Sequence, residues 1–362
     1  MSTFFDIKVA RVQRETDDAV SVYFEIPEDR KADFAYKAGQ YITIEMNVQG
    51  ENVRRAYSLC TSPLSDPQPA VTVKKVQGGR MSVYLNTTLK AGDILKLMPP
   101  EGRFTPEINA SAKKQYILFA GGSGITPMMS ILKTVLQSEP QSIIHLVYAN
   151  RSKNTVIFKD QLEQFEKSHK GRFEVTHVYD SAGLFSSGIK GPLTVDTVKK
   201  IYGKVRREEY TADVFICGPA GMMDAVKNGL FHTNLSDEQI HIEYFTAPVS
   251  GNSSAATQTN AASTAQPATG GNAEVELTLS GTTHHLSVGP RKTILAAAQD
   301  AGLDPPYSCE AGICSTCMAK VTEGSVRMIE NNILTQKEVD AGFVLTCQAI
   351  CTSPKVKIEF FD

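Results

Sequence analysis

The sequence predicts a multidomain protein with three folded parts: an antiparallel β-barrel, an α/β domain on a parallel sheet, and a small α+β domain. Its 362 residues are too many for a single core. Near Lys113 the pattern changes from short β-rich runs to strands that alternate with helices. Residues 248–272 contain mostly Ser, Ala, Thr, Asn, Gln and Gly, and they separate the last part from the rest.

Residues 1–108 are expected to form the barrel. The runs VYFEI, YITIEM, VTVKKV and ILKLM are rich in β-formers and are separated by Gly, Pro and Asn. This spacing is typical of antiparallel strands joined by turns.

Residues 109–247 are expected to form the α/β domain. YILFA precedes the helical run MMSILKTVL, IIHLVYA precedes FKDQLEQFEKS, and DVFICG precedes AGMMDAVKNGL. Strands that alternate with helices indicate a parallel sheet with right-handed crossovers.

Residues 248–272 carry no charge and no aromatic side chain, so we expect a flexible tether. Its root-mean-square span would be roughly 25–30 Å. Residues 273–362 form the third part, in which EVELTLSG and TTHHLSV predict a hairpin and Ile294–Ala301 a helix.

The composition narrows the classes of function. A net charge of −2 gives no reason to expect nucleic-acid or membrane binding. The first residues lack the basic and apolar regions of a secretory signal, and no apolar run approaches the length of a membrane span. Seven cysteines in such a chain suit a reducing compartment, so we expect a cytoplasmic protein.

Four cysteines near the C-terminus have a distinctive spacing. Cys309, Cys314 and Cys317 follow the pattern C-x4-C-x2-C, and Cys347 comes after a long gap. This is the plant-type spacing for the ligands of a [2Fe–2S] cluster. Four reduced thiols and a zinc site are the alternatives, but zinc sites usually pair two C-x2-C units. Cys351 is expected to be a core residue.

The barrel contains Arg55-Ala56-Tyr57-Ser58 on one predicted strand. A flavin needs a cation at its pyrophosphate, a wall beside its ring and a hydrogen-bond partner at its N5 edge. These three side chains supply such groups. An exposed Arg beside a packed Tyr is the alternative.

Three glycine-containing segments are candidates for binding a nucleotide cofactor, the first two through its phosphates. Gly78-Gly79-Arg80-Met81-Ser82 opens a predicted helix, and Gly121-Gly122-Ser123-Gly124-Ile125-Thr126-Pro127 lies between a strand and a helix. Cys217-Gly218-Pro219 ends a strand of the parallel sheet, where ligands gather. Ordinary turns and a buried strand cysteine are the alternatives.

The choice of nicotinamide cofactor depends on Arg151 and Ser152, which follow the strand IIHLVYA. An acidic residue here would select NADH, whereas Arg suits the 2′-phosphate of NADPH. No acidic residue is close by, so NADPH is expected rather than NADH. A solvated Arg is the alternative.

PYSCEAGICSTC together with LTCQA resembles a plant-type ferredoxin domain, which implies a β-grasp fold and Cys309, Cys314, Cys317 and Cys347 as cluster ligands. Glu310 departs from the Arg that is common at this place. R-x-Y-S, the Gly79–Ser82 segment and GGSGITP, in this order, resemble the ferredoxin–NADP reductase superfamily. The resemblance implies FAD, with FMN as the alternative.

The same resemblance implies roles for the remaining site residues. Arg55, Tyr57 and Ser58 would contact the flavin, and Gly79 and Ser82 would lie near the FAD phosphates. Gly121, Gly122, Gly124, Gly218 and Pro219 would bind the nicotinamide cofactor, and Thr126 and Cys217 would lie close to its nicotinamide ring. Phe245 would shield the flavin ring, with Glu243 nearby, so Ser58, Cys217 and Glu243 are the expected catalytic group. A packed aromatic residue is the alternative for Phe245.

The domain order resembles the reductase components of multicomponent oxygenases. YANRSKNTVIFKDQL and EYF favour the phenylacetyl-CoA epoxidase type. Such a protein would pass electrons from NADPH through FAD and the cluster to an oxygenase partner. A reductase for another aromatic-ring or alkane oxygenase, a stand-alone flavin reductase and a redox sensor are the alternatives.

Overall fold

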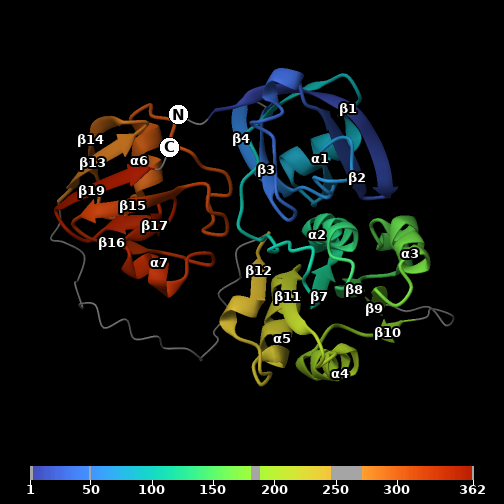
Figure 1. Cartoon of the computed structure of the whole chain (residues 1–362). Coiled ribbons are helices and arrows are strands. Elements are labelled where there is room, and N and C mark those ends of the chain that lie inside the picture. The colour runs from blue at the N-terminus through green and yellow to red at the C-terminus, as the bar shows by residue number, and fades with distance from the viewer. Residues whose placement is uncertain (1–2, 49, 181–187, 246–270, 361–362) are drawn as a thin grey trace. The chain divides into compact units, whose positions relative to one another are not determined.

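The computed structural model describes residues 3–48, 50–180, 188–245 and 271–360. The chain divides into two compact units, one of which is Phe4–Phe245 while the other contains the C-terminal residues (Figure 1). Most of the predicted tether, residues 248–270, lies outside the described residues.

The first sheet is antiparallel and has the strand order β4-β3-β6-β1-β2-β5. Its strands are β1 (Phe5–Thr16), β2 (Ala19–Glu25), β3 (Tyr41–Val48), β4 (Glu51–Ser58), β5 (Ala70–Lys74) and β6 (Ile94–Leu97). An isolated bridge between Leu59 and Val71 joins the two edges of the sheet beyond β4. Apolar side chains fill the interior, and helix α1 (Arg80–Thr87) follows β5. The predicted antiparallel architecture is confirmed.

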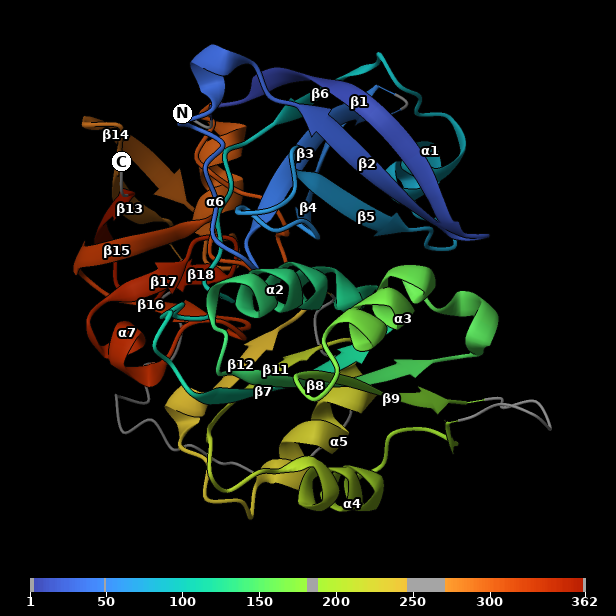
Figure 2. The ribbon, with the colours of Figure 1, turned by 45° about the vertical axis from the view of Figure 1, so that its right-hand side comes forward.

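The second sheet is parallel and has the order β10-β9-β8-β7-β11-β12. Its strands are β7 (Lys114–Gly121), β8 (Ile143–Asn150), β9 (Phe173–Tyr179), β10 (Ile189–Lys190), β11 (Thr211–Cys217) and β12 (Ile240–Glu243). The helices are α2 (Ile125–Ser138), α3 (Lys159–Ser168), α4 (Val195–Val205) and α5 (Ala220–Leu230). Figure 2 shows α2 and α3 on one face and α4 and α5 on the other. The covered faces explain why β7 is buried almost throughout.

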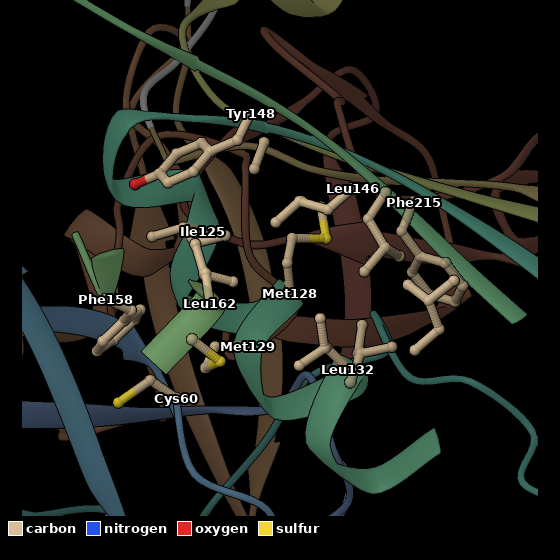
Figure 3. Packing of buried hydrophobic residues seen from close by; sticks show 14 of the residues in the cluster. Cys60, Ile125, Met128, Met129, Leu132, Leu146, Tyr148, Phe158, Leu162 and Phe215 are labelled. Carbon is tan, nitrogen blue, oxygen red and sulfur yellow. The ribbon is translucent and has the colours of Figure 1, made fainter. Parts of the chain in front are cut away.

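Helix α2 packs against both the barrel and the parallel sheet. It lies between the parallel sheet and the barrel (Figure 2). One apolar cluster contains α2 residues such as Met129, sheet residues such as Leu146, and Cys60 and Ala70 from the barrel side (Figure 3). The barrel and the α/β domain therefore share a hydrophobic core.

The C-terminal unit has a mixed sheet of order β14-β13-β19-β15-β17 and a separate pair β16-β18. Its strands are β13 (Ala273–Leu279), β14 (Thr282–Val288), β15 (Met318–Glu323), β16 (Val326–Met328), β17 (Phe343–Leu345), β18 (Ala349–Cys351) and β19 (Lys355–Phe360). Its helices are α6 (Ile294–Asp300) and α7 (Gln336–Asp340). Two apolar clusters consist only of residues from this unit, so it has a core of its own.

No helix in the described part of the chain is both long and apolar enough to cross a membrane.

Candidate flavin, nucleotide and cluster sites

Strand β4 presents the residues that the sequence assigns to the flavin. Arg55 is exposed, and its guanidinium donates to the carbonyl of Arg54. Tyr57, two residues on and therefore on the same face, is half-buried against the barrel core. Arg54 instead forms a buried ion pair with Glu45 at 2.8 Å. An outward cation beside a half-buried ring suits the pyrophosphate and ring of a flavin.

Ser58 meets Glu243 although 185 residues separate them in the sequence. The Ser58 hydroxyl donates to the Glu243 carboxyl at 3.0 Å, and both residues are buried. Cys217, which is fully buried, pairs in register with Glu243 on the neighbouring parallel strand. The structure therefore brings together the three residues that the sequence assigns to catalysis.

Burial changes the protonation of this group. Desolvation raises the pKa of Glu243 from 4.5 to about 8, against the lowering effect of the hydrogen bond from Ser58. Burial is the main cause that raises the pKa of the Cys217 thiol, and the nearby Glu243 raises it further. At neutral pH the arrangement therefore holds a proton on the carboxyl and keeps the thiol neutral.

The glycine loop between β7 and α2 lies directly against the end of β11. A Cβ on Gly124 would come within 2.1 Å of the Cys217 carbonyl oxygen, and one on Gly121 within 2.6 Å of the Pro219 ring. A Cβ on Gly218 would meet the Gly121 nitrogen at 2.9 Å. Only glycine permits this approach of the two loops, which meet at the carboxyl edge of the sheet, where ligands of such sheets bind.

Side chains around the glycine loop fix its conformation. Thr126 is buried and donates to the Ser123 carbonyl at 3.0 Å. Tyr148 donates to the carbonyl of Gly122, whose φ is +52°. Lys74 Nζ lies 3.8 Å from the position that a Cβ on Gly122 would take.

The sequence did not single out Lys74 or Tyr148. Lys74 is one of two adjacent lysines, Lys74 and Lys75, and Tyr148 sits within an apolar strand. Their contacts with the glycine loop depend on tertiary packing, so no local pattern marks them.

The segment before α1 is closed by its own hydrogen bonds. Ser82 Oγ accepts from the Val76 amide at 3.1 Å and donates to the Gly79 carbonyl at 3.4 Å. A Cβ on Gly79 would lie 2.5 Å from that hydroxyl oxygen. Gly79 and Ser82 therefore stabilise the turn that precedes α1 through contacts within the turn.

The predicted nucleotide-selecting residues follow β8 at the carboxyl edge of the sheet. Arg151 and Lys153 are exposed there, and Ser152 is half-buried. The Ser152 amide donates to the Thr155 hydroxyl at 3.2 Å, which begins a short helical turn. Phe245 follows β12 and is 37% exposed.

The cluster cysteines lie in the C-terminal unit on the loop before β15 and in the turn after β17. The Cys314 thiol donates to Cys309 at 3.1 Å, and the side chains of Cys317 and Cys347 also interact. The hydrogen bond from Cys314 has the largest effect in lowering the pKa of Cys309, and the hydrogen bond from Cys347 lowers it further. In the described residues no three candidate ligands surround one metal position. A two-iron cluster instead takes two thiolates at each iron.

The surroundings of these thiols fit a cluster. The hydroxyl of Ser308 is buried and has no protein partner among the described residues, so it is available to a sulfide or thiolate. Gly312 has a φ of +69°, and a Cβ there would lie 3.0 Å from the Glu330 carbonyl oxygen. Gln348 Nε2 donates to the Glu310 carbonyl and approaches Cys347 Sγ at 3.6 Å. Small residues and inward donors suit a negatively charged cluster.

Three family descriptions match the chain in the order of its sheets. They are the oxidoreductase FAD-binding domain over residues 6–105, the oxidoreductase NAD-binding domain over 118–228, and the 2Fe-2S iron-sulfur cluster binding domain over 277–352.

Curated relatives match almost the whole chain. A 1,2-phenylacetyl-CoA epoxidase component from Escherichia coli K12 is 33% identical, and the match covers 99% of this chain and 98% of the relative. The ferredoxin reductase component of 3-ketosteroid-9-alpha-monooxygenase from Rhodococcus rhodochrous is 35% identical, with coverages of 98% and 96%. The solved structure of phthalate dioxygenase reductase has a TM-score of 0.58 and 24% identity, and covers 99% of this chain and 98% of that chain, which shows a shared fold.

The chain therefore belongs to the NAD(P)H-dependent reductases that combine FAD, nicotinamide and [2Fe–2S] ferredoxin domains and serve as components of oxygenases. It transfers electrons from NAD(P)H through FAD and a [2Fe–2S] cluster to an oxygenase.

Proposed function

We propose that this chain is the NADPH-dependent reductase of a phenylacetyl-CoA epoxidase system in the cytoplasm. The observation that carries the proposal is the match to the Escherichia coli epoxidase component over nearly the full length of both chains. The segment YANRSKNTVIFKDQL supports the same assignment. We assign residues 1–108 to FAD, 109–247 to the nicotinamide cofactor and 273–362 to the cluster, with 248–272 as the linker.

Each site contributes one part of the electron path. A bound flavin accepts the two electrons of a hydride and releases them singly, which a nicotinamide cannot do and a [2Fe–2S] cluster requires. Arg55 and Tyr57 hold the flavin on the outer face of β4. Gly121, Gly122, Gly124 and Thr126 receive the nicotinamide cofactor beside Cys217, Gly218 and Pro219. Phe245, which is more than a third exposed, covers the flavin ring.

Ser58 and Glu243 hold a proton where hydride transfer takes place. The protonated carboxyl is buried and receives the Ser58 hydroxyl, so bulk water does not compete for that contact. Cys217 remains neutral because its burial disfavours the thiolate. We therefore assign these three residues to orienting the nicotinamide and to supplying the proton that accompanies flavin reduction.

The substitution Cys314→Ser tests the electron path. Removing one of the four thiolates disrupts the cluster, so reduction of cytochrome c by NADPH should be lost. Ferricyanide accepts electrons from the flavin directly, so its reduction should be retained. Loss of both activities, or of neither, would contradict an electron path in which the cluster follows the flavin.

The partner requires a separate test, because the ketosteroid monooxygenase component is as similar as the epoxidase component. A reductase for ketosteroid hydroxylation is therefore the second candidate. Purified chain should be combined with NADPH, phenylacetyl-CoA and the oxygenase subunits of the epoxidase, and in parallel with the ketosteroid oxygenase and its substrate. Product formation with the ketosteroid system alone would overturn our assignment.

A further inference from the structure

We propose that a cluster of buried and half-buried contacts between α2 and the loop after β4 sets the position of the nicotinamide relative to the flavin. We call these contacts the α2 clamp. It comprises Thr61, Ser62 and Asp66 on the loop and Ser130, Lys133 and Thr134 on α2. The inference rests on the proposed placement of the flavin beside β4.

The clamp connects the two segments that would carry the reacting groups. Its loop begins one residue after Ser58, the last residue of β4. Its helix begins at Ile125, directly after the glycine loop. Because α2 is a continuous helix of 14 residues, holding its middle on the loop fixes where its first turn lies.

Three direct contacts form the clamp. Ser130 Oγ donates to the Thr61 carbonyl at 2.5 Å. Lys133 Nζ lies 3.1 Å from Asp66 Oδ2, and Ser62 Oγ lies 2.9 Å from Thr134 Oγ1. Ser130, Thr134, Thr61 and Ser62 are all at most 3% exposed. Buried hydrogen bonds of this kind are costly to break, because the separated groups cannot turn to water.

The direction of the Ser62–Thr134 bond follows from its neighbours. The Thr134 hydroxyl donates to the Ser130 carbonyl at 2.8 Å, which uses its only hydrogen. Ser62 Oγ accepts from the Leu64 amide at 3.2 Å. Ser62 therefore donates to Thr134, and the two hydroxyls form one chain from the loop to the helix backbone.

The loop itself is preorganised for these contacts. The Ser62 amide donates to Asp66 Oδ2 at 2.7 Å, and the Asp66 amide donates to the Ser62 carbonyl at 3.2 Å. Thr61 Oγ1 binds Tyr36 and accepts from the Ala70 amide. Cys60 packs in the apolar cluster that contains Met129 of α2 (Figure 3). Apolar and polar contacts thus hold the same two segments together.

A rigid connection between these segments matters for hydride transfer, which requires the reacting atoms at a fixed short distance. A misplacement of about 1 Å can cost about 100-fold in rate. The clamp residues do not belong to the proposed cofactor sites, so they are positioning residues. Removing them should change the rate of hydride transfer more than the affinity for the nucleotide.

The test uses FAD-loaded full-length protein and the substitution Thr134→Val, which removes the hydroxyl but keeps the shape. Anaerobic stopped-flow absorbance measures flavin reduction by NADPH and by NADH, and calorimetry measures the dissociation constant of NADP⁺. We expect the limiting reduction rate to fall by about 10-fold or more, with the dissociation constant unchanged within about 2-fold. Thr134→Ser should restore the rate. Lys133→Met should also lower the limiting reduction rate. This variant provides the test if Thr134→Val fails to fold.

Thr176→Val is the matched control, because Thr176 makes a side-chain hydrogen bond to His145 at 2.8 Å within the α/β domain. Equal rate losses in Thr176→Val and Thr134→Val would overturn the proposal. Wild-type reduction rates in both clamp variants would also overturn it, and so would a loss of nucleotide affinity that parallels the loss of rate.

Hydrogen exchange gives a readout that does not depend on turnover. In FAD-loaded full-length protein without nucleotide, the amides of Leu64 and Asp66 should exchange faster in Thr134→Val than in wild type, since the clamp orders their loop. Unchanged exchange would overturn the clamp. If neither nucleotide reduces the wild-type flavin, the proposed function fails, and the exchange measurement still decides the clamp.

Discussion

A single buried carboxyl links the barrel to the parallel sheet. Glu243 receives Ser58 from β4 and lies beside Cys217 on β11, so it contacts two segments that are far apart in the sequence. The family resemblance placed Ser58, Cys217 and Glu243 in one catalytic group. Spacing and residue type alone could not show that they meet, because neither encodes a contact between a barrel strand and the last strand of another sheet.

The substitution Glu243→Gln should flatten the dependence of stability on pH. Burial raises the pKa of Glu243 from 4.5 to about 8, so between these values the folded chain keeps a proton that the unfolded chain releases. This stabilisation is complete below pH 4.5 and is lost as pH rises to about 8, by about 1.4 kcal/mol per pH unit. Glutamine cannot ionise. Urea denaturation across this window measures the difference, and identical slopes in the two proteins would refute the raised pKa.

The substitution Arg151→Ala tests the proposed preference for NADPH, which it should reduce. If Arg151 binds the 2′-phosphate, its loss removes a charge-assisted hydrogen bond, and kcat/KM for NADPH should fall about 10-fold or more. The value for NADH, which lacks that phosphate, should hardly change. Lys199→Ala on the exposed face of α4 is the control for a general change in charge. Equal losses with both nucleotides would argue against a role in selection.

At the scale of elements, the apolar periodicity of the sequence predicted those helices and strands that local sequence specifies. The run AGMMDAVKNGL coincides with α5, and GGSGITP lies at the junction of β7 and α2, as expected. The elements β1, α4 and α7 were not predicted from the sequence. β1 alternates polar and apolar residues over a long stretch with an irregular register, and α7 is a single short turn stabilised by its Thr335 cap. In β1 and α4 polar residues interrupt the apolar ones, so a search for continuous apolar runs misses them, whereas α7 depends on its cap.

The substitution Gly124→Ala should test the contact between the glycine loop and β11. The added Cβ would lie 2.1 Å from the Cys217 carbonyl oxygen, so the loop or the strand has to move. We expect a loss of about 1–3 kcal/mol in the free energy of unfolding and weaker nucleotide binding.

Gly203→Ala is the matched control, because Gly203 lies within α4 and a Cβ there meets nothing within 4 Å. It should stabilise the protein by about 1 kcal/mol. Chemical denaturation and NADP⁺ calorimetry measure both variants, and an unperturbed Gly124→Ala would show that the loop is not tightly packed.

At the scale of the whole molecule, each compact unit has its own apolar core. Among the residues that the structure describes, the clusters of the C-terminal unit contain none from Phe4–Phe245, and those of the larger unit contain none from the C-terminal part. Composition predicts a division at residues 248–272, because an uncharged Ser- and Ala-rich stretch has too little apolar surface to form a core. Composition could not reveal that the barrel and α/β domain share a core, since that depends on which face of α2 meets Cys60.

Shortening the stretch between Phe245 and Ala273 should affect electron transfer to the acceptor. We infer that this stretch keeps the cluster unit at a high local concentration near the flavin while letting it reach an external protein. Removing about ten residues should slow cytochrome c reduction more than flavin reduction by NADPH. Stopped-flow absorbance separates the two steps, and a Gly/Ser replacement of the original length is the control. If both steps slow equally, the cluster unit has no such shuttling role.

The position of Glu243 has a practical consequence for dissecting the protein. β12 is a four-residue edge strand paired with β11, and its last residue carries the buried carboxyl. A fragment ending after α5 would still contain every predicted helix of the first unit, yet it would lack this strand. A fragment that keeps the contact between Ser58 and Glu243 therefore has to extend at least through Glu243. Fusions to other redox proteins should be joined downstream of that boundary.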